Sequence, residues 1–124
     1  MDAKAIDQLL ESQRQYFLSG ATLPVEFRIA MLQRLRETVR RREPDISKAL
    51  TADLGKSGYE GYMCEIGLVL SELGYLIRHT RRFAKRRHVP TPLAQFAASS
   101  YLSPSPYGNV LIMSPWNYPL LLTL

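Results

Sequence analysis

Apolar residues recur at helical spacing over the first three quarters of the chain. In residues 1–20 they fall roughly on one face, at Ile6, Leu9, Leu10, Phe17 and Leu18. The next segment repeats the pattern at steps of three and four, at Val25, Ile29, Leu32, Leu35 and Val39. Gly20 lies between the two segments and suits the left-handed cap of a helix. The pattern predicts two amphipathic helices joined near this glycine.

Two more helices are predicted further along the chain. Pro44 marks the start of a new element, and the short stretch "DISKALTADLG" after it is predicted to form a helix that ends at Gly55. From Tyr59 onward another apolar seam steps by three and four, at Met63, Ile66, Leu70, Leu73 and Ile77. Residues 1–91 are therefore predicted to form an N-terminal helical segment with short joints.

The pattern changes after the two prolines at Pro90 and Pro92, which end any helix. Residues 92–107 are small, polar and weakly alternating, and they are predicted to form an extended arm or two-stranded hairpin. A free hairpin is at best marginally stable in water, so this arm is expected to dock against something larger.

The last segment, residues 108–124, carries an apolar run without alternation at Val110–Met113, bounded by Gly108 and Pro115. Such runs are typical of strands covered on both faces in parallel α/β sheets. The "LLLTL" that follows is expected to begin a helix. The predicted fold class is thus α/β, with a mostly α-helical front, an extended arm, and the first strand of a parallel Rossmann-like sheet. The domain is expected to be incomplete at Leu124, because such a strand needs parallel neighbours.

Composition narrows the class of protein. The 124 residues are 46% hydrophobic, with no run near the roughly 20 apolar residues of a membrane-spanning helix. The charged N-terminus has no signal-peptide core. A single cysteine excludes an internal disulfide framework, and with two histidines it argues against a structural zinc site. We expect a soluble cytoplasmic protein without a metal centre.

Two short motifs in the helical segment are given ordinary structural interpretations. "LGKS" at Leu54–Ser57 resembles the end of a phosphate-binding loop, but Leu50 stands where that loop requires its first glycine. It is interpreted as a helix cap followed by a turn. Cys64 lies beside the acidic Glu65, which would oppose a reactive thiolate, so it is interpreted as a packed thiol.

The basic run Arg78–Arg87 carries much of the net charge of +5. Its cations fall at helical spacing and could contact phosphates of nucleic acid or anionic lipid. The run has one aromatic residue, Phe83, and no recognition module, which favours a solvated helix end. A basic nucleic-acid or membrane-surface binder remains an alternative, as does a non-catalytic helical interaction module.

The loop "SPWNYP", which follows the apolar strand opened by Tyr107 and Gly108, resembles the aldehyde dehydrogenase superfamily. The stretches "FLSGATLPVEFRIAMLQRL", "ALTADLGKS" and "EIGLVLSEL" are similar to the opening helices of its class 3 branch, whose members oxidise aromatic and medium- to long-chain aldehydes. The resemblance covers nearly all of the chain but only about the first quarter of a family member.

The resemblance implies an NAD(P)-dependent enzyme that oxidises an aldehyde to a carboxylic acid through a thiohemiacetal and a thioester, with NAD or NADP as cofactor. It implies that the side-chain amide of Asn117 stabilises the oxyanion and that Tyr118 lines the aldehyde pocket. The residues implied to line the cofactor cleft are Met113, Ser114, Pro115 and Trp116. The nucleophilic cysteine and the glutamate base are expected beyond Leu124. Neither Cys64 nor Glu65 matches them, so the fragment alone is expected to be inactive.

The arm at residues 92–107 is similar to part of the family's oligomerisation element. The resemblance therefore implies a homodimer of the full-length protein, a small-molecule aldehyde as partner, and no nucleic acid.

Overall fold

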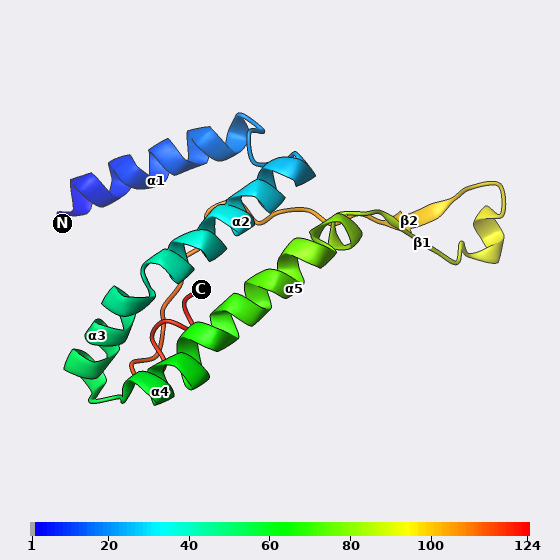
Figure 1. The fold of residues 1–124 in the computed structure, drawn as a ribbon. Helices are drawn as coiled ribbons and strands as arrows, with labels where there is room; N and C mark the ends of the chain where they lie inside the picture. The colour runs from blue at the N-terminus through cyan, green and yellow to red at the C-terminus, as the bar shows by residue number, and fades with distance from the viewer. Residues whose placement is uncertain (1) are drawn as a thin grey trace.

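The structure of the chain is a computed structural model that describes residues 2–124. The N-terminal part of the chain is helical. The chain then extends into a short hairpin before it returns to the helices (Figure 1). In chain order the elements are α1 (Ala3–Leu18), α2 (Val25–Arg41), α3 (Glu43–Leu54), α4 (Gly58–Gly61), the π-helical turn η1 (Tyr62–Ile66), α5 (Gly67–Phe83), β1 (Arg87–Val89), the 3₁₀ turn η2 (Leu93–Gln95) and β2 (Ser100–Leu102). The prediction of a mostly helical front is confirmed.

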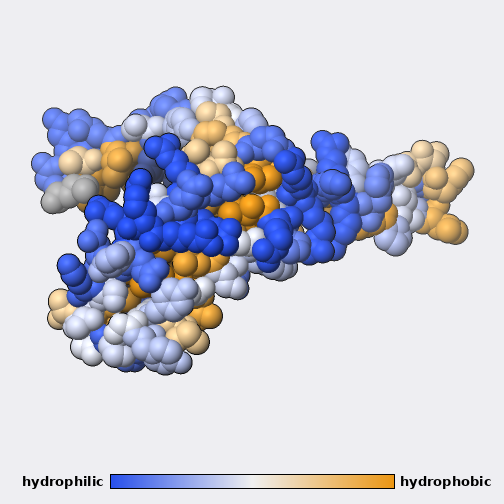
Figure 2. All heavy atoms as spheres, in the orientation of Figure 1, coloured by the Kyte–Doolittle hydropathy of each residue, from blue (hydrophilic) through white to orange (hydrophobic). Residues whose placement is uncertain are grey.

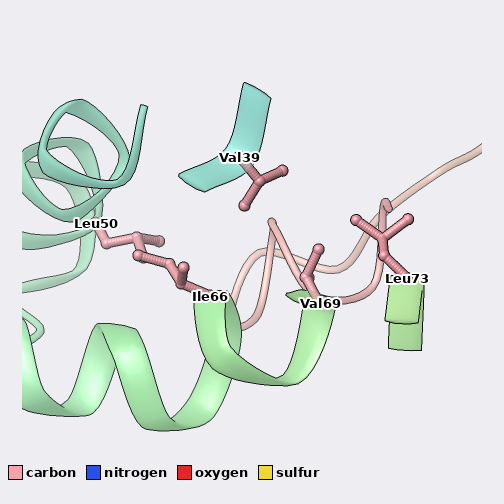
Figure 3. Close-up of a cluster of buried hydrophobic side chains, with 5 residues drawn as sticks. All are labelled: Val39, Leu50, Ile66, Val69 and Leu73. Carbon is pink, nitrogen blue, oxygen red and sulfur yellow. The ribbon is translucent and has the colours of Figure 1, made fainter. Parts of the chain in front are cut away.

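The helical core lies where α2, α3 and the η1–α5 helix meet. Five buried side chains point toward one another there, as Figure 3 shows: Val39, Leu50, Ile66, Val69 and Leu73. Leu32 and Leu35 of α2 pack against this cluster, which confirms the apolar seam predicted for that helix. Burial of these five side chains, each worth about 1.5–3 kcal/mol, is what holds the helices together.

The helix α1 is placed differently. Its N-cap Asp2 accepts a hydrogen bond from the Ala5 amide at 2.8 Å, and Gly20 at φ +75° turns the chain after its end. The predicted apolar face exists as a stripe, but none of its residues is buried. The helix therefore contributes little to the core among residues 2–124.

A π turn interrupts the long helix at Tyr62–Ile66 and changes the predicted seam. A π turn inserts one residue into the helical repeat, so the faces before and after it are out of register. Met63, predicted to lie in the seam, is exposed, whereas the consecutive residues Glu65 and Ile66 are both fully buried. Gly67 relieves crowding after the wide turn, because a Cβ there would lie 3.0 Å from the Tyr62 carbonyl oxygen.

The arm is a two-stranded antiparallel hairpin in which Arg87 pairs with Leu102 and Val89 with Ser100. The prediction of an arm or hairpin is confirmed in kind, but its first strand lies before residue 92 and begins at Arg87, the last residue of the basic run. Pro90 and Pro92 lie in the connection, where no backbone N–H is needed for the ladder. The tip is apolar and exposed, with Leu93 and Phe96 at its surface (Figure 2).

After the hairpin the chain returns along the first helix. The Asn109 Nδ2 donates to the Leu10 carbonyl at 3.1 Å. Gly108 adopts φ +91°, and an added Cβ there would lie 3.3 Å from the ring of Phe17. These contacts bring the final segment back to the helices.

The strand predicted at Val110–Met113 is not realised among the described residues. These four side chains are exposed, and the segment has no ladder partner. The physical reason is that a buried parallel strand exists only when neighbouring strands supply its hydrogen bonds and its cover. In residues 2–124, β1 and β2 pair with each other.

The chain then forms a helical turn against the core. The Leu122 amide donates to the Tyr118 carbonyl at 3.2 Å and the Leu124 amide to the Leu120 carbonyl at 3.2 Å. Leu120 and Leu121 are partly buried against the core cluster, so the end of the chain lies beside α2, α3 and α5 (Figure 1). None of the helices within residues 2–124 is long and apolar enough to cross a membrane.

Candidate functional site

The loop Ser114–Pro119 is closed by its own hydrogen bonds. The Ser114 hydroxyl lies 3.2 Å from the carbonyl oxygens of Pro115 and Pro119, at the two ends of the loop. The Thr123 hydroxyl also donates to the Pro119 carbonyl. Two prolines restrict the backbone of the loop. The loop therefore has a defined shape before any contact with the helices is considered.

A buried carboxylate holds the C-terminal end of this loop. Glu65, at 0% exposure, accepts hydrogen bonds at Oε2 from the backbone amides of Leu120, at 2.8 Å, and Leu121, at 3.3 Å. These are amides at the beginning of a helical turn, where backbone N–H groups lack intrahelical partners. Glu65 thus acts as an anion at the start of the last turn of the chain.

A buried lysine holds the middle of the loop. The Lys56 ammonium, on a side chain at 8% exposure, donates to Glu65 Oε1 at 2.5 Å and to the Asn117 carbonyl at 2.8 Å. It also lies 4.2 Å from the centre of the Tyr118 ring, a cation–π contact. A single nitrogen therefore joins the helical layer, the buried carboxylate and the loop.

Local sequence explains why these two charges meet. Gly55 caps α3 in the left-handed conformation and turns the chain, so Lys56 leaves the helix at once. The Thr51 hydroxyl donates to the Lys56 carbonyl at 2.7 Å, and Ser57 caps the next helix by accepting from the Glu60 amide at 3.1 Å. The π turn then brings Glu65 to the buried side. Two helix caps and one π turn build the pair.

The predicted site residues Ser114–Tyr118 lie on this loop, and Met113 directly precedes it. Asn117 is exposed, and among residues 2–124 no hydrogen bond engages its side-chain amide, although its carbonyl is held. Trp116 and Met113 are 89% and 85% exposed, Pro115 is exposed and Ser114 is half-buried. Tyr118 is partly exposed beside the ammonium. The assigned roles of these residues stay predictions.

Sequence reasoning missed Lys56 and Glu65. The interpretation of "LGKS" as a helix cap and turn is confirmed by the αL conformation of Gly55. That interpretation left Lys56 without a partner. Glu65 was considered as a neighbour of Cys64 and as a candidate base, but not as a partner of Lys56. The available signal was the position of Glu65 next to Ile66 in the apolar seam. A charged side chain at such a position needs a partner, since charged side chains are almost never fully buried unless paired. Cys64 is a partly buried free thiol in the π turn.

The basic run does not form one continuous helical face. The helix α5 ends at Phe83, and Arg87 belongs to β1. Arg81 forms a two-pronged ion pair with Glu26 of α2, and Arg86 lies 4.7 Å from the ring of Tyr101. Part of the positive charge is thus already matched within the chain, which supports the interpretation of the run as a solvated helix end. The structure adds that Arg87 belongs to the base of the hairpin.

Duplex DNA is therefore expected to bind the purified chain weakly. We expect a Kd weaker than about micromolar at physiological salt, with a steep loss of affinity as salt rises, as for non-specific binding to phosphates. Fluorescence anisotropy with a labelled duplex over a salt series measures both quantities. Binding tighter than about micromolar at physiological salt would favour a phosphate-binding face at Arg78–Arg87.

Comparison with known proteins identifies the family. The family model described as "Aldehyde dehydrogenase family" matches residues 1–124. The chain is 39% identical over 115 residues to aldehyde dehydrogenase family 3 member B1 of Bos taurus, covering 93% of this chain and 25% of that protein. It is 38% identical over 120 residues to the dimeric NADP-preferring aldehyde dehydrogenase of Canis lupus familiaris, covering 96% and 26%.

A solved structure gives the same result. The chain superposes on the substrate-bound state of Staphylococcus aureus AldH with a TM-score of 0.91 at 35% identity, covering 98% of this chain and 26% of that one. The chain belongs to the aldehyde dehydrogenase family. Its similarity to family 3 members confirms the class 3 resemblance. The chain spans about a quarter of the length of the relatives it matches.

Proposed function

We propose that this chain is the N-terminal part of an NAD(P)-dependent aldehyde dehydrogenase that oxidises an aldehyde to a carboxylic acid. Family membership over residues 1–124 supports the reaction class. The relative from Canis lupus familiaris is named as an NADP-preferring enzyme, which supports a nicotinamide cofactor for this chain. Class 3-like substrates, aromatic or medium- to long-chain aldehydes, are the ones we propose.

One observation carries the proposed role of Asn117. Its backbone carbonyl is fixed by Lys56 at 2.8 Å, while its exposed side-chain amide bonds to no other residue within 2–124. A residue that merely stabilised its own turn would use the side chain for that purpose. A fixed backbone with an uncommitted N–H donor leaves this amide available to an oxyanion that develops beside the loop.

In the proposed reaction a cysteine thiolate, supplied by the rest of the enzyme, adds to the carbonyl carbon of the aldehyde. The electron pair of the C=O bond moves to oxygen, and the Asn117 amide donates a hydrogen bond to the resulting oxyanion. Collapse of this adduct expels a hydride and leaves a thioester, which water hydrolyses to the acid. A neutral donor suits both stages, since it stabilises the oxyanion without a proton transfer of its own.

The residues Met113, Ser114, Pro115 and Trp116 fit part of a dinucleotide site. Met113 and Trp116 expose large apolar side chains. Ser114, which lies between these two residues in the sequence, adds a hydroxyl group. An exposed apolar surface with a few polar groups is typical of a ligand site and suits a planar ring and ribose hydroxyls. These four residues would line one side of the cofactor, which, when bound, accepts the hydride.

The remaining roles follow from position. We propose that Tyr118, with one part of its ring beside the Lys56 ammonium, lines the aldehyde pocket through its exposed part. We propose a homodimer of the full-length enzyme in which the tip of the hairpin contacts the partner subunit. The tip exposes Leu93 and Phe96, and exposed apolar patches often mark protein–protein interfaces. A cytoplasmic location is proposed as well.

The assay that tests the reaction compares two proteins. The full-length enzyme is expected to produce NADH or NADPH with benzaldehyde and with a long-chain aldehyde. The purified 124-residue chain is expected to show no turnover above a heat-inactivated control, because Cys64 lies in the π turn and both oxygens of Glu65 are engaged. Turnover by the 124 residues alone would contradict the assignment of the nucleophile to the rest of the enzyme.

A further inference from the structure

We propose that Lys56 and Glu65 are positioning residues for Asn117: this buried ion pair fixes the loop from which the oxyanion donor acts. The inference rests on the role proposed above for Asn117. Its basis is a set of contacts between residues 56 and 65 of the helical layer and residues 117–121, at the other end of the chain. Neither charged residue is proposed to touch the substrate.

The pair holds the loop at two points. At the first, the Lys56 ammonium donates to the Asn117 carbonyl at 2.8 Å, so the backbone of the donor residue itself is fixed. At the second, Glu65 Oε2 accepts from the Leu120 and Leu121 amides at 2.8 and 3.3 Å. The bond between Lys56 Nζ and Glu65 Oε1, at 2.5 Å, joins the two points. The segment between Asn117 and Leu121 is therefore clamped at both ends.

The burial of Lys56 and Glu65 indicates that the pair has a role beyond stability. Glu65 is 0% and Lys56 7% exposed, so both charges are removed from water. Removal of charges from water is costly, and a buried ion pair is often replaceable by apolar residues without loss of stability. Stability alone is thus a poor explanation for the pair. Its polar contacts beyond the ion pair itself go mainly to the loop backbone, where they determine position.

The geometry favours a lysine over an arginine at position 56. One nitrogen atom contacts a carboxylate oxygen, a carbonyl oxygen and an aromatic face, which suits a compact ammonium with three donors. A planar guanidinium is larger and presents its donors in a fixed fork. We therefore expect Lys56→Arg to displace the loop in spite of keeping the charge.

The position of the loop matters because oxyanion stabilisation depends on short distances. A donor must lie about 2.7–3.1 Å from the developing oxyanion, and a misplacement of about 1 Å can cost about 100-fold in rate. The Asn117 side chain moves with the backbone that Lys56 holds. Loss of Lys56 is thus expected to reduce the contribution of Asn117 without removing the amide.

The test is a double-mutant cycle in the full-length enzyme with Lys56→Met, Asn117→Ala and the double variant. Lys48→Met makes the same chemical change at an exposed lysine of α3 and serves as the matched control. We expect Lys56→Met to lower kcat by about 10- to 100-fold. In the Asn117→Ala background, Lys56→Met is expected to cost less than about threefold, because residues that act through one another are not additive.

The outcomes separate the two proposals. If Asn117→Ala is fully active, the proposed function of Asn117 is wrong, whatever Lys56 does. If Asn117→Ala is impaired but Lys56→Met has normal kcat, or if the two losses multiply, the positioning role is overturned. A purely structural role of Lys56 would lower the melting temperature and leave the coupling to Asn117 at zero.

If Lys56→Met does not fold, a second variant, Glu65→Gln, tests the same proposal. Glu65→Gln keeps the shape of the side chain and one oxygen acceptor for the loop amides, while it removes the charge that pairs with Lys56. The same cycle with Asn117→Ala is expected to show the same non-additive loss. If both variants fail to fold, the pair is a requirement of the fold and the proposed positioning role is rejected.

Discussion

Replacement of Asn117 by alanine in the full-length enzyme is expected to lower kcat/KM by about two to three orders of magnitude, the usual loss for one oxyanion donor. The fold and the cofactor affinity should remain nearly intact, because the Asn117 side chain is exposed and bonds to no residue within 2–124. The backbone carbonyl that Lys56 holds is unchanged by the substitution. Measurement of kcat/KM and melting temperature on the same protein samples tests both statements.

Two companion variants sharpen this experiment. Asn117→Asp should be at least as damaging, since a carboxylate repels the developing oxyanion. Asn109→Ala is the matched control, because within residues 2–124 the Asn109 side chain bonds to the Leu10 carbonyl and makes no hydrogen bond to the loop Ser114–Pro119. We expect its kcat/KM to stay close to that of the unaltered enzyme. An unstable but fully active Asn117→Ala enzyme would remove the catalytic role.

The second large effect concerns stability. Ile66 is 0% exposed at the centre of the core cluster, between Leu50 and Val69 (Figure 3). Ile66→Ala removes buried carbon atoms and leaves a cavity, which typically costs about 2–5 kcal/mol. The cost should be near the upper end, because the π turn and the neighbouring Glu65 contacts restrict local collapse.

The control for this variant is Ile6→Ala. Ile6 lies on α1 at 44% exposure, so the same change in side chain removes much less buried surface and should cost less than about 1 kcal/mol. Thermal and urea unfolding of the two variants give the difference in free energy. Equal destabilisation by both substitutions would mean that α1 is packed as tightly as the core, against the exposure seen for its apolar face.

Much of the fold follows from local sequence patterns. The seam of α2, the helix cap at Gly55 and an arm or hairpin after the helices were all predicted, because helical periodicity, glycine and proline act over a few residues. The predicted placement of Met63 in the core was wrong. One π turn shifts the faces of that helix, and periodicity counts assume an uninterrupted repeat.

The candidate site divides in the same way. The motif "SPWNYP" identifies the loop and the family from sequence, since the residue types themselves carry that information. The exposure of Val110–Met113 could not be predicted from those residues, because whether a strand forms depends on its neighbours. The roles assigned to Met113–Tyr118 rest on the motif and stay predictions.

By itself the sequence determined the helical elements, the arm and the loop that carries Asn117. Only the tertiary structure decided how that loop is held. Lys56 contacts Glu65 nine residues away and Asn117 61 residues away, at a point where α3, the π turn and the returning chain meet. No local pattern predicts such a contact, because a buried charge is tolerated only when the packing of distant segments brings its partners within hydrogen-bonding distance.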